Sequence, residues 1–243
     1  MVTPYDQDIW GSIAFVEESN LPPTMPNRRK FRAKLCMDQQ LRKAISRQQL
    51  KDAVASTILK IRFAKEAFHQ LGKIDLEFSA RLLRLESPHE VNIRINLKNY
   101  YRLVRELDSF MFELYGSFDY FSKEIDLVLG LGLKDPYCSF GQVKQVLEKR
   151  GGDDDLRRVT LKVWQSEWFE YIRKLRHRLT HRNGIIVCFS NNELYFPDDP
   201  LSEPESTYKR MKVIPTCHLW LEQSMGYIEE ATGYLGERVF PEW

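Results

Sequence analysis

The sequence predicts a mainly α-helical fold, a bundle of long antiparallel helices with a small antiparallel β insertion before the last helix. Two long runs carry apolar residues mostly three or four positions apart, which is the spacing of one face of an amphipathic helix. Short β-branched or alternating segments, separated by turn sequences, fall between residues 184 and 214. A chain of 243 residues is long enough to bury a full core in one domain.

The first 27 residues contain four prolines and are expected to form an irregular N-terminal arm. Residues 28–243 are then expected to form one helical domain. A long helix is predicted over residues 28–71 and is expected to end at Gly72, because glycine is common just after a helix C-terminus. A shorter helix is expected next, ending at Ser87-Pro88.

A second long helix is predicted over residues 96–129, and its aromatic stripe is expected to be core or dimer surface rather than a cofactor site. Further helices are predicted over residues 140–149, from residue 156 to the Asn183-Gly184 pair, and over residues 216–238.

The run GGDDD at 151–155 could suggest a metal site, but a loop with an aspartate N-cap is the simpler reading. The β insertion is predicted from GIIVCFS (184–190), ELYF (193–196) and YKRMKVI (208–214).

The composition gives no global nucleic-acid signature, because 36 basic and 34 acidic residues leave a net charge of only +2. A site for a polyanion must therefore come from local clustering. The four cysteines are scattered without a C-x-x-C pair, which favours reduced thiols over a zinc ribbon or a disulfide framework. With no recognisable secretory signal and no run of about 18 apolar residues, the protein is expected to be cytoplasmic and not inserted in a membrane.

Residues 173–184 read RKLRHRLTHRNG and gather five cations and two histidines four positions apart. At about 100° per residue, Leu175 and its helical neighbours form the buried stripe, and several polar residues fan across the opposite face. Those residues are Arg173, Arg176, His177, Thr180 and His181. The flanks carry Lys174, Arg178 and Arg182.

Three interpretations of this segment stay open. Cations in a last helical turn complement the helix dipole, so the segment could be a solvated helix end. His177 and His181 could share a metal ion, although no glutamate lies between them and the neighbouring arginines would repel a dication. Arginine can also bind phosphate by two parallel hydrogen bonds and histidine can move a proton near neutral pH, which suits metal-free phosphate chemistry.

The hexapeptide from Arg176 to His181, RHRLTH, resembles the R-x(4–6)-H motif of HEPN domains (higher eukaryotes and prokaryotes nucleotide-binding). The resemblance implies a helical bundle and a metal-independent endoribonuclease that works as a homodimer without a cofactor. Arg176 and His181 would be catalytic with His177 assisting, and Arg173, Lys174, Arg178 and Thr180 would contact RNA. It also implies a toxin or defence role with an antitoxin or regulatory protein as a partner.

The motif is short, and the sequence contains two further matches, RFAKEAFH from Arg62 to His69 and RLESPH from Arg84 to His89. The first has a phenylalanine after its arginine and lies in an early helix, and the second contains Ser-Pro, which disfavours a helix. We therefore prefer RHRLTH. Members of the family often add an acidic or polar residue from an earlier helix, and Glu113, Asp119 and Glu124 are the candidates.

Two function classes follow. The first is cleavage of RNA by its own 2′-hydroxyl at a cleft between two subunits. The second is a non-catalytic module on the same fold that binds RNA, nucleotide or protein, because a fold alone does not fix a function.

Overall fold

The protein is described by a computed structural model covering residues 24–37, 46–82, 97–133, 138–151, 154–181, 187–190, 193–197, 211–240 and 242–243. For residues 75–82, 97–99, 181, 188–190 and 193 it describes the backbone alone. The described elements are α2 (Pro26–Cys36), α3 (Arg47–Leu82), α4 (Leu97–Leu129), α5 (Phe140–Arg150), α6 (Asp155–Trp164), α7 (Glu167–His181), β1 (Cys188–Ser190), β2 (Glu193–Phe196), β3 (Met211–Lys212) and α8 (Val213–Val239). The predicted class, a helical bundle with a small antiparallel sheet before the last helix, is confirmed.

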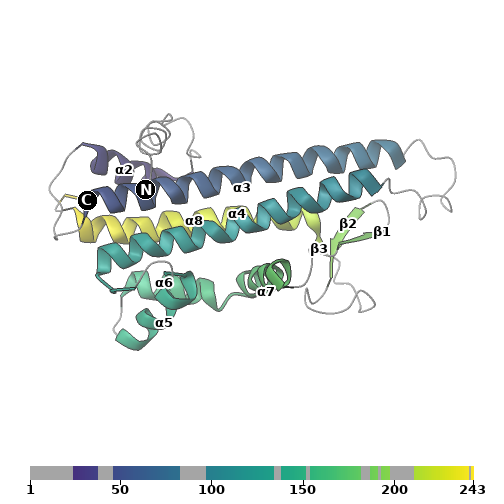
Figure 1. The fold of residues 1–243 in the computed structure, drawn as a ribbon. Helices are drawn as coiled ribbons and strands as arrows, with labels where there is room; N and C mark the ends of the chain where they lie inside the picture. Colours follow the sequence, from purple (N-terminus) through teal and green to yellow (C-terminus); the bar gives the residue numbers. More distant parts are fainter. Residues whose placement is uncertain are drawn as a thin grey trace, which may run out of the picture.

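Two long helices, α3 and α4, lie side by side along most of their length, and α8 runs beside both (Figure 1). The short helix α2 packs against α8 and α3, while α5 and α7 pack against α4, and α6 packs against α8 and α5 (Figure 1). The predicted second long helix matches α4 within one residue. The predicted helix over 140–149 matches α5, and the last helix is α8.

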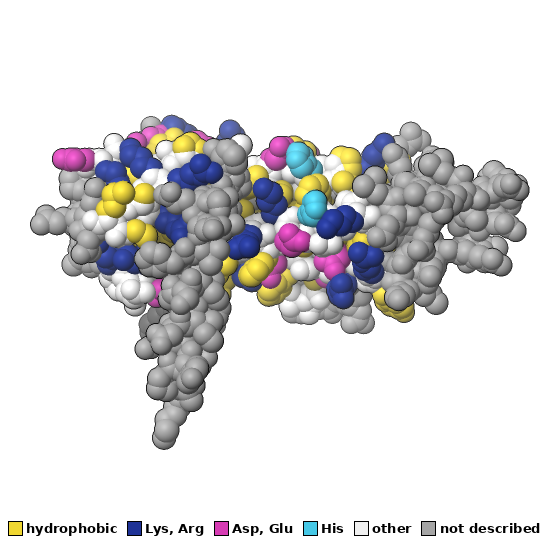
Figure 2. Space-filling view, turned by 90° about the horizontal axis from the view of Figure 1, so that it is seen from above, with side chains coloured by type: hydrophobic (Ala, Val, Ile, Leu, Met, Phe, Trp, Pro, Cys, Tyr) yellow, Lys and Arg dark blue, Asp and Glu magenta, His cyan; other side chains and the backbone are white. Residues whose placement is uncertain are grey.

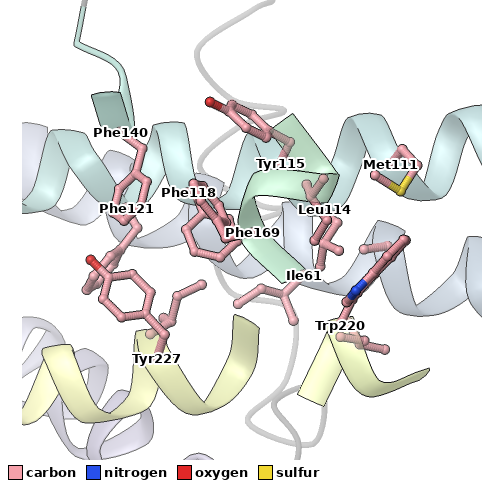
Figure 3. Close-up of a cluster of buried hydrophobic side chains, with 14 of the residues drawn as sticks. Ile61, Met111, Leu114, Tyr115, Phe118, Phe121, Phe140, Phe169, Trp220 and Tyr227 are labelled. Atoms are coloured by element: carbon pink, nitrogen blue, oxygen red, sulfur yellow. The ribbon is translucent and has the colours of Figure 1, made fainter. Parts of the chain in front are cut away.

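The core is built around the aromatic stripe of α4, as expected from its spacing. The ring of Phe118 lies 4.8 Å from that of Phe169 on α7 and 5.1 Å from that of Phe140 on α5. It also stacks on Tyr227 of α8, with ring centroids 5.6 Å apart (Figure 3). The Tyr227 hydroxyl lies 3.1 Å from that of Thr160. A single buried ring therefore holds four helices together, and the stripe is core.

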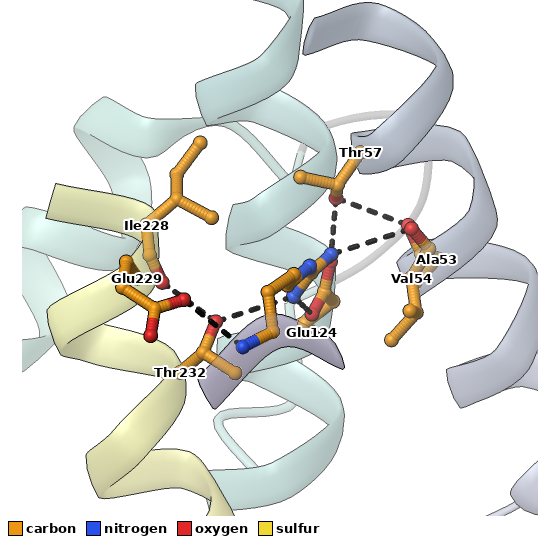
Figure 4. A network of polar contacts seen from close by, with 8 residues as sticks. Ala53, Val54, Thr57, Glu124, Ile228, Glu229 and Thr232 are labelled. Carbon is orange, nitrogen blue, oxygen red and sulfur yellow. Dashed lines mark hydrogen bonds and ion pairs between the residues drawn. The ribbon is translucent and has the colours of Figure 1, made fainter. Parts of the chain in front are cut away.

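A buried ion pair fixes α2 on the bundle. Both terminal nitrogens of the Arg28 guanidinium lie 2.5 Å from the carboxylate of Glu124, and both side chains have no exposed surface. Thr57 also donates to Glu124, and Thr232 accepts from Arg28 (Figure 4). Further hydrogen bonds of this kind offset the cost of removing the two charges from water.

The sheet has the order β1-β2-β3, with both pairs antiparallel. Strand β2 covers the predicted ELYF segment, and β1 is the end of the predicted first segment. The third segment was predicted too long, because α8 begins at Val213 and takes up Val213 and Ile214. Residues 198–210 lie outside the described residues.

The predicted helix over 28–71 is wrong in two respects. It is two helices, because α2 ends at Cys36 and α3 begins at Arg47. Gly72 does not end a helix, since α3 continues to Leu82 and takes in most of the shorter helix expected next. Glycine inside a helix costs about 1 kcal/mol relative to alanine, and burial of Leu71 and Ile74 on either side offsets that cost.

The helix predicted from residue 156 to the Asn183-Gly184 pair is also two helices, α6 and α7. The break falls at Gln165 and Ser166, where the Ser166 hydroxyl donates to the carbonyl of Val163 at 2.6 Å. The carbonyl of Ser166 accepts the N–H of Glu170, which starts α7. Serine followed by an acidic first turn is a helix-start signal, so the sequence contained this break. Asn183-Gly184 lies outside the described residues.

The expected aspartate N-cap is confirmed. The Asp154 side chain accepts the N–H of Leu156 at 3.0 Å and begins α6. The arm was predicted two residues too long, because α2 starts at Pro26, where proline suits the first helical position. Residues 1–23 of the arm lie outside the described residues.

Candidate functional site

The basic segment lies on α7, which packs against α4 and α6. Phe169, Ile172 and Leu175 of α7 are fully buried, as the predicted apolar stripe requires. Because this stripe faces α4, residues at its edge come into contact with α4 side chains.

Arg176 lies at that edge rather than on the face opposite the core. Its Nη2 atom lies 3.2 Å from the Asp119 carboxylate of α4. Its guanidinium carbon lies 4.0 Å from the centroid of the Tyr115 ring, also on α4. The Arg176 side chain is 41% exposed, so it is held by two partners on one side and meets solvent on the other.

Asp119 connects three helices. Its Oδ1 atom accepts the N–H of Phe140, the first residue of α5, at 3.1 Å, while the side chain of the N-cap residue Ser139 makes no capping hydrogen bond. Burial raises the pKa of the Asp119 carboxyl above its ordinary value, and the Arg176 guanidinium and the Phe140 N–H oppose that rise. The same carboxylate therefore holds the arginine and the start of α5.

The guanidinium of Arg176 lies over the ring of Tyr115. That ring stacks on Phe169 with centroids 5.9 Å apart, which fixes the surface on which the guanidinium lies. Burial raises the pKa of the Tyr115 hydroxyl, the Asp119 charge adds to the rise, and Arg176 opposes it. The phenol is therefore protonated at neutral pH and can act as a hydrogen-bond donor.

Of the three acidic candidates, Asp119 is the one in contact with the motif arginine. Glu113 pairs instead with Lys60 of α3 at 2.8 Å. Glu124 is buried in its pair with Arg28. Among the described residues, Asp119 is therefore the acidic partner of Arg176 on the earlier helix.

The other predicted site residues surround Arg176 on α7. His177 is exposed, and the exposed Thr180 donates its hydroxyl to the carbonyl of Arg176 at 2.9 Å. Lys174 lies 3.5 Å from Glu170 one turn earlier. The backbone of His181 closes α7, and its side chain lies outside the described part of the chain.

Arg173 and Arg178 are both half-buried. The guanidinium of Arg173 lies 4.3 Å from the centroid of the Trp164 ring on α6. Sequence reasoning missed this contact and the role of Tyr115, because both aromatic residues fit the helical spacing of core positions. The 3.6-residue period does place Tyr115 and Asp119 on one face of α4, and that was the available signal.

The alternative motif on α3 lies elsewhere. Arg62 and His69 are both exposed on α3, which packs mainly against α2, α4 and α8. On the face that carries α3, basic and acidic side chains are interspersed rather than gathered by sign (Figure 2). The third match, from Arg84 to His89, lies outside the described residues.

Among the described side chains, no group of three or more His, Cys, Asp or Glu residues could hold a metal ion. No described helix combines the length and apolar character needed to cross a membrane. In comparisons with known proteins, no family model, curated protein or solved structure matches the chain.

Proposed function

We propose that the protein is a HEPN-like, metal-independent endoribonuclease whose site centres on Arg176, with His181 and His177. The observation that supports the proposal best is the setting of Arg176, held by Tyr115 and Asp119 with part of its side chain open to solvent. A fixed guanidinium can donate hydrogen bonds to phosphate oxygens without having to be ordered first. An acidic residue contributed by an earlier helix is also what the family resemblance leads us to expect.

In the proposed reaction, the ribose 2′-oxygen forms a bond to phosphorus while the bond from phosphorus to the 5′-oxygen breaks. A histidine takes the 2′-hydroxyl proton, and a protonated histidine supplies a proton to the departing 5′-oxygen. The products are a 2′,3′-cyclic phosphate and a 5′-hydroxyl. Arg176 stabilises the charge on the non-bridging oxygens, so the step needs neither a metal ion nor a protein nucleophile.

In the proposed homodimer, the two copies of Arg176 and His181 form one composite cleft. Lys174, Arg173 and Arg178 on the same helix attract the phosphate backbone, so the affinity for RNA falls as salt rises. A protein partner that regulates the site remains part of the proposal by resemblance alone.

The test is cleavage of a labelled mixed-sequence RNA in EDTA by the wild type, Arg176→Ala, Arg176→Lys and His181→Ala. Arg62→Ala and His69→Ala are the matched controls, because they change the same residue types at exposed positions on α3. We expect cyclic-phosphate ends from the wild type and both controls, and loss of cleavage in the Arg176 and His181 variants. Circular dichroism and sedimentation check that each variant keeps its fold and its oligomeric state.

A second candidate, a non-catalytic RNA-binding module, is favoured by the ion pair itself. Asp119 lies 3.2 Å from Arg176 and offsets part of its charge. This loss affects catalysis more than binding, because the phosphoryl oxygens carry more negative charge in the transition state than in intact RNA. Salt-dependent RNA binding without cleavage by the wild type would support this candidate. Cleavage that survives in the Arg176 and His181 variants would contradict the assignment of Arg176 and His181 as catalytic residues.

A further inference from the structure

An exposed aromatic residue lies beside the candidate site on α4. Phe112 is 61% exposed, whereas Phe110, Phe118 and Phe121 of the same helix are fully buried. It precedes Asp119 by seven residues, so two helical turns place both residues on the same side of α4 about 10 Å apart along the axis. An exposed ring thus lies on the helix that holds Arg176.

Phe112 is held by a cation. Lys60 of α3 places its Nζ atom 4.8 Å from the centroid of the Phe112 ring and 2.8 Å from the Glu113 carboxylate. The stem of Lys60 crosses Gly116, where a Cβ atom would lie 3.3 Å from it. The lack of a side chain at Gly116 therefore lets the lysine lie close to α4 beside the ring.

A second aromatic residue continues the surface along α4. The ring of Tyr120 has the Nζ atom of Lys123 at 5.3 Å and that of Lys60 at 5.9 Å from its centroid. The Lys123 charge acts on Asp119, where it opposes the rise of the carboxyl pKa. We call the group of Lys60, Phe112, Tyr120 and Lys123 the α4 platform, and it adjoins the Arg176 site.

We propose that the α4 platform binds single-stranded RNA, with a base stacked on Phe112 and the adjoining phosphates at Lys60, Lys123 and Arg176. Aromatic rings interleaved with cations are the surface that single-stranded nucleic acids use, because every base has a flat face to stack and every linkage carries a negative charge. This inference rests on the proposed function in taking RNA as the substrate. It adds that the RNA is single-stranded and that Phe112 positions it.

The charges on the platform favour RNA over a second copy of the chain. The centres of protein interfaces are depleted in charged residues, whereas each ring of the platform has a lysine against it. Covering the platform with protein would also remove water from the Lys60–Glu113 pair, which is costly. A polyanionic strand instead brings charges opposite in sign to those of the lysines beside the rings.

The test measures binding of a fluorescent 2′-O-methyl RNA, which lacks the attacking hydroxyl and so separates binding from cleavage. The variants are Phe112→Ala, Phe112→Tyr and Phe112→Leu. Leu219→Ala is the control, because Leu219 is an exposed apolar residue on α8, away from the platform, and is 50% exposed. The preceding residue, His218, contacts Phe68, and Phe68 contacts the buried Phe110 on the other side of α4. We expect Phe112→Ala and Phe112→Leu to weaken binding about fivefold or more, and Phe112→Tyr and the control to bind like the wild type.

A duplex of the same sequence adds a second comparison, because its bases are stacked on one another and cannot stack on Phe112. We expect the Phe112 variants to bind it as the wild type does. If Phe112→Ala binds the single strand like the wild type, the α4 platform proposal is wrong whether or not the protein cleaves RNA. If the Phe112 pattern holds but the wild type does not cleave RNA in EDTA, the platform is supported and the nuclease is not.

Sedimentation identifies the competing role of the surface. If Phe112→Ala dissociates a dimer while Phe112→Leu keeps it, the surface is a contact between copies of the chain and the RNA platform is overturned. Because Phe112 is exposed, its substitutions are expected to leave the thermal midpoint unchanged, so a change in binding can be assigned to the surface.

Discussion

The carboxylate of Asp119 lies 3.2 Å from the guanidinium of Arg176 and accepts the first N–H of α5 at 3.1 Å. A single side chain on α4 thus fixes the motif arginine on α7 and the start of a neighbouring helix. The two contacts use different oxygens, so they can be separated by substitution.

Asp119→Ala removes both acceptors, whereas Asp119→Asn keeps a carbonyl oxygen for the Phe140 N–H. We expect Asp119→Ala to lower the free energy of unfolding by about 1–2 kcal/mol, because it leaves a part-buried N–H without a partner. Asp119→Asn should cost less than about 1 kcal/mol. Urea unfolding measures both. Equal losses in the two variants would mean that the Phe140 contact contributes nothing.

Asp119 should also give the protein a specific dependence on pH. Its pKa is raised above the ordinary value of 3.8, first by burial, so the folded state keeps its proton to a higher pH than the unfolded state does. The stability that this group contributes is complete below pH 3.8 and is lost as pH rises through the raised folded value. The amide of Asp119→Asn does not titrate in this range, so the variant lacks this dependence on pH.

The measurement is the difference in the free energy of unfolding between the wild type and Asp119→Asn across that acidic window. We expect the wild type to lose stability relative to the variant as pH rises. A difference that moves in the opposite direction would mean that the attraction of Arg176, not burial, dominates the carboxyl.

Asp154 provides the aspartate N-cap that the sequence predicted, and it also pairs with a residue of α8 that the sequence did not indicate. Its Oδ1 atom caps α6, and its Oδ2 atom lies 2.5 Å from Arg238 near the end of α8. Asp154→Ala should cost about 1–2 kcal/mol. Asp155→Ala is the matched control and should stay within about 0.5 kcal/mol, because Asp155 is exposed in its pair with Arg158. A loss at Asp155 as large as that at Asp154 would contradict the capping role.

The helices could be predicted because burial on one face imposes a period of 3.6 residues, which is visible wherever the face is long. The errors at Gly72 and at Ser166 have different causes. The helix continues through Gly72 because Leu71 and Ile74 on either side of it are buried. The Ser166 break carried a recognisable helix-start signal that the longer apolar pattern concealed.

The site could be predicted in part. The basic segment singled out Arg176 as a candidate, and the HEPN resemblance narrowed the expected acidic partner to three residues of the second long helix. Which of the three faces Arg176 depends on where α7 crosses α4, and no local pattern encodes that crossing. Tyr115 was missed for the same reason, since a ring that is 7% exposed has the spacing of any core position.

The last prediction concerns the buried pair of Arg28 and Glu124. Arg28→Met leaves the Glu124 carboxylate in the core with Thr57 as its remaining donor among the described residues, so it should cost about 3–5 kcal/mol. Glu124→Met should cost a similar amount. The double variant should be more stable than either single variant, because no buried charge is left without its partner. Both threonines keep a bond in it, since the Thr57 hydroxyl also donates to Ala53 and that of Thr232 to Ile228.

Urea unfolding of the wild type, the two single variants and the double variant gives the coupling energy of the pair. Arg158→Met, at an exposed ion pair with Asp155, is the control and should change stability by less than about 1 kcal/mol. Additive losses in the double variant would contradict the prediction, because they would mean that each side chain contributes through packing rather than through its partner's charge. A double variant as stable as the wild type would show that the bundle does not need the ion pair for its stability.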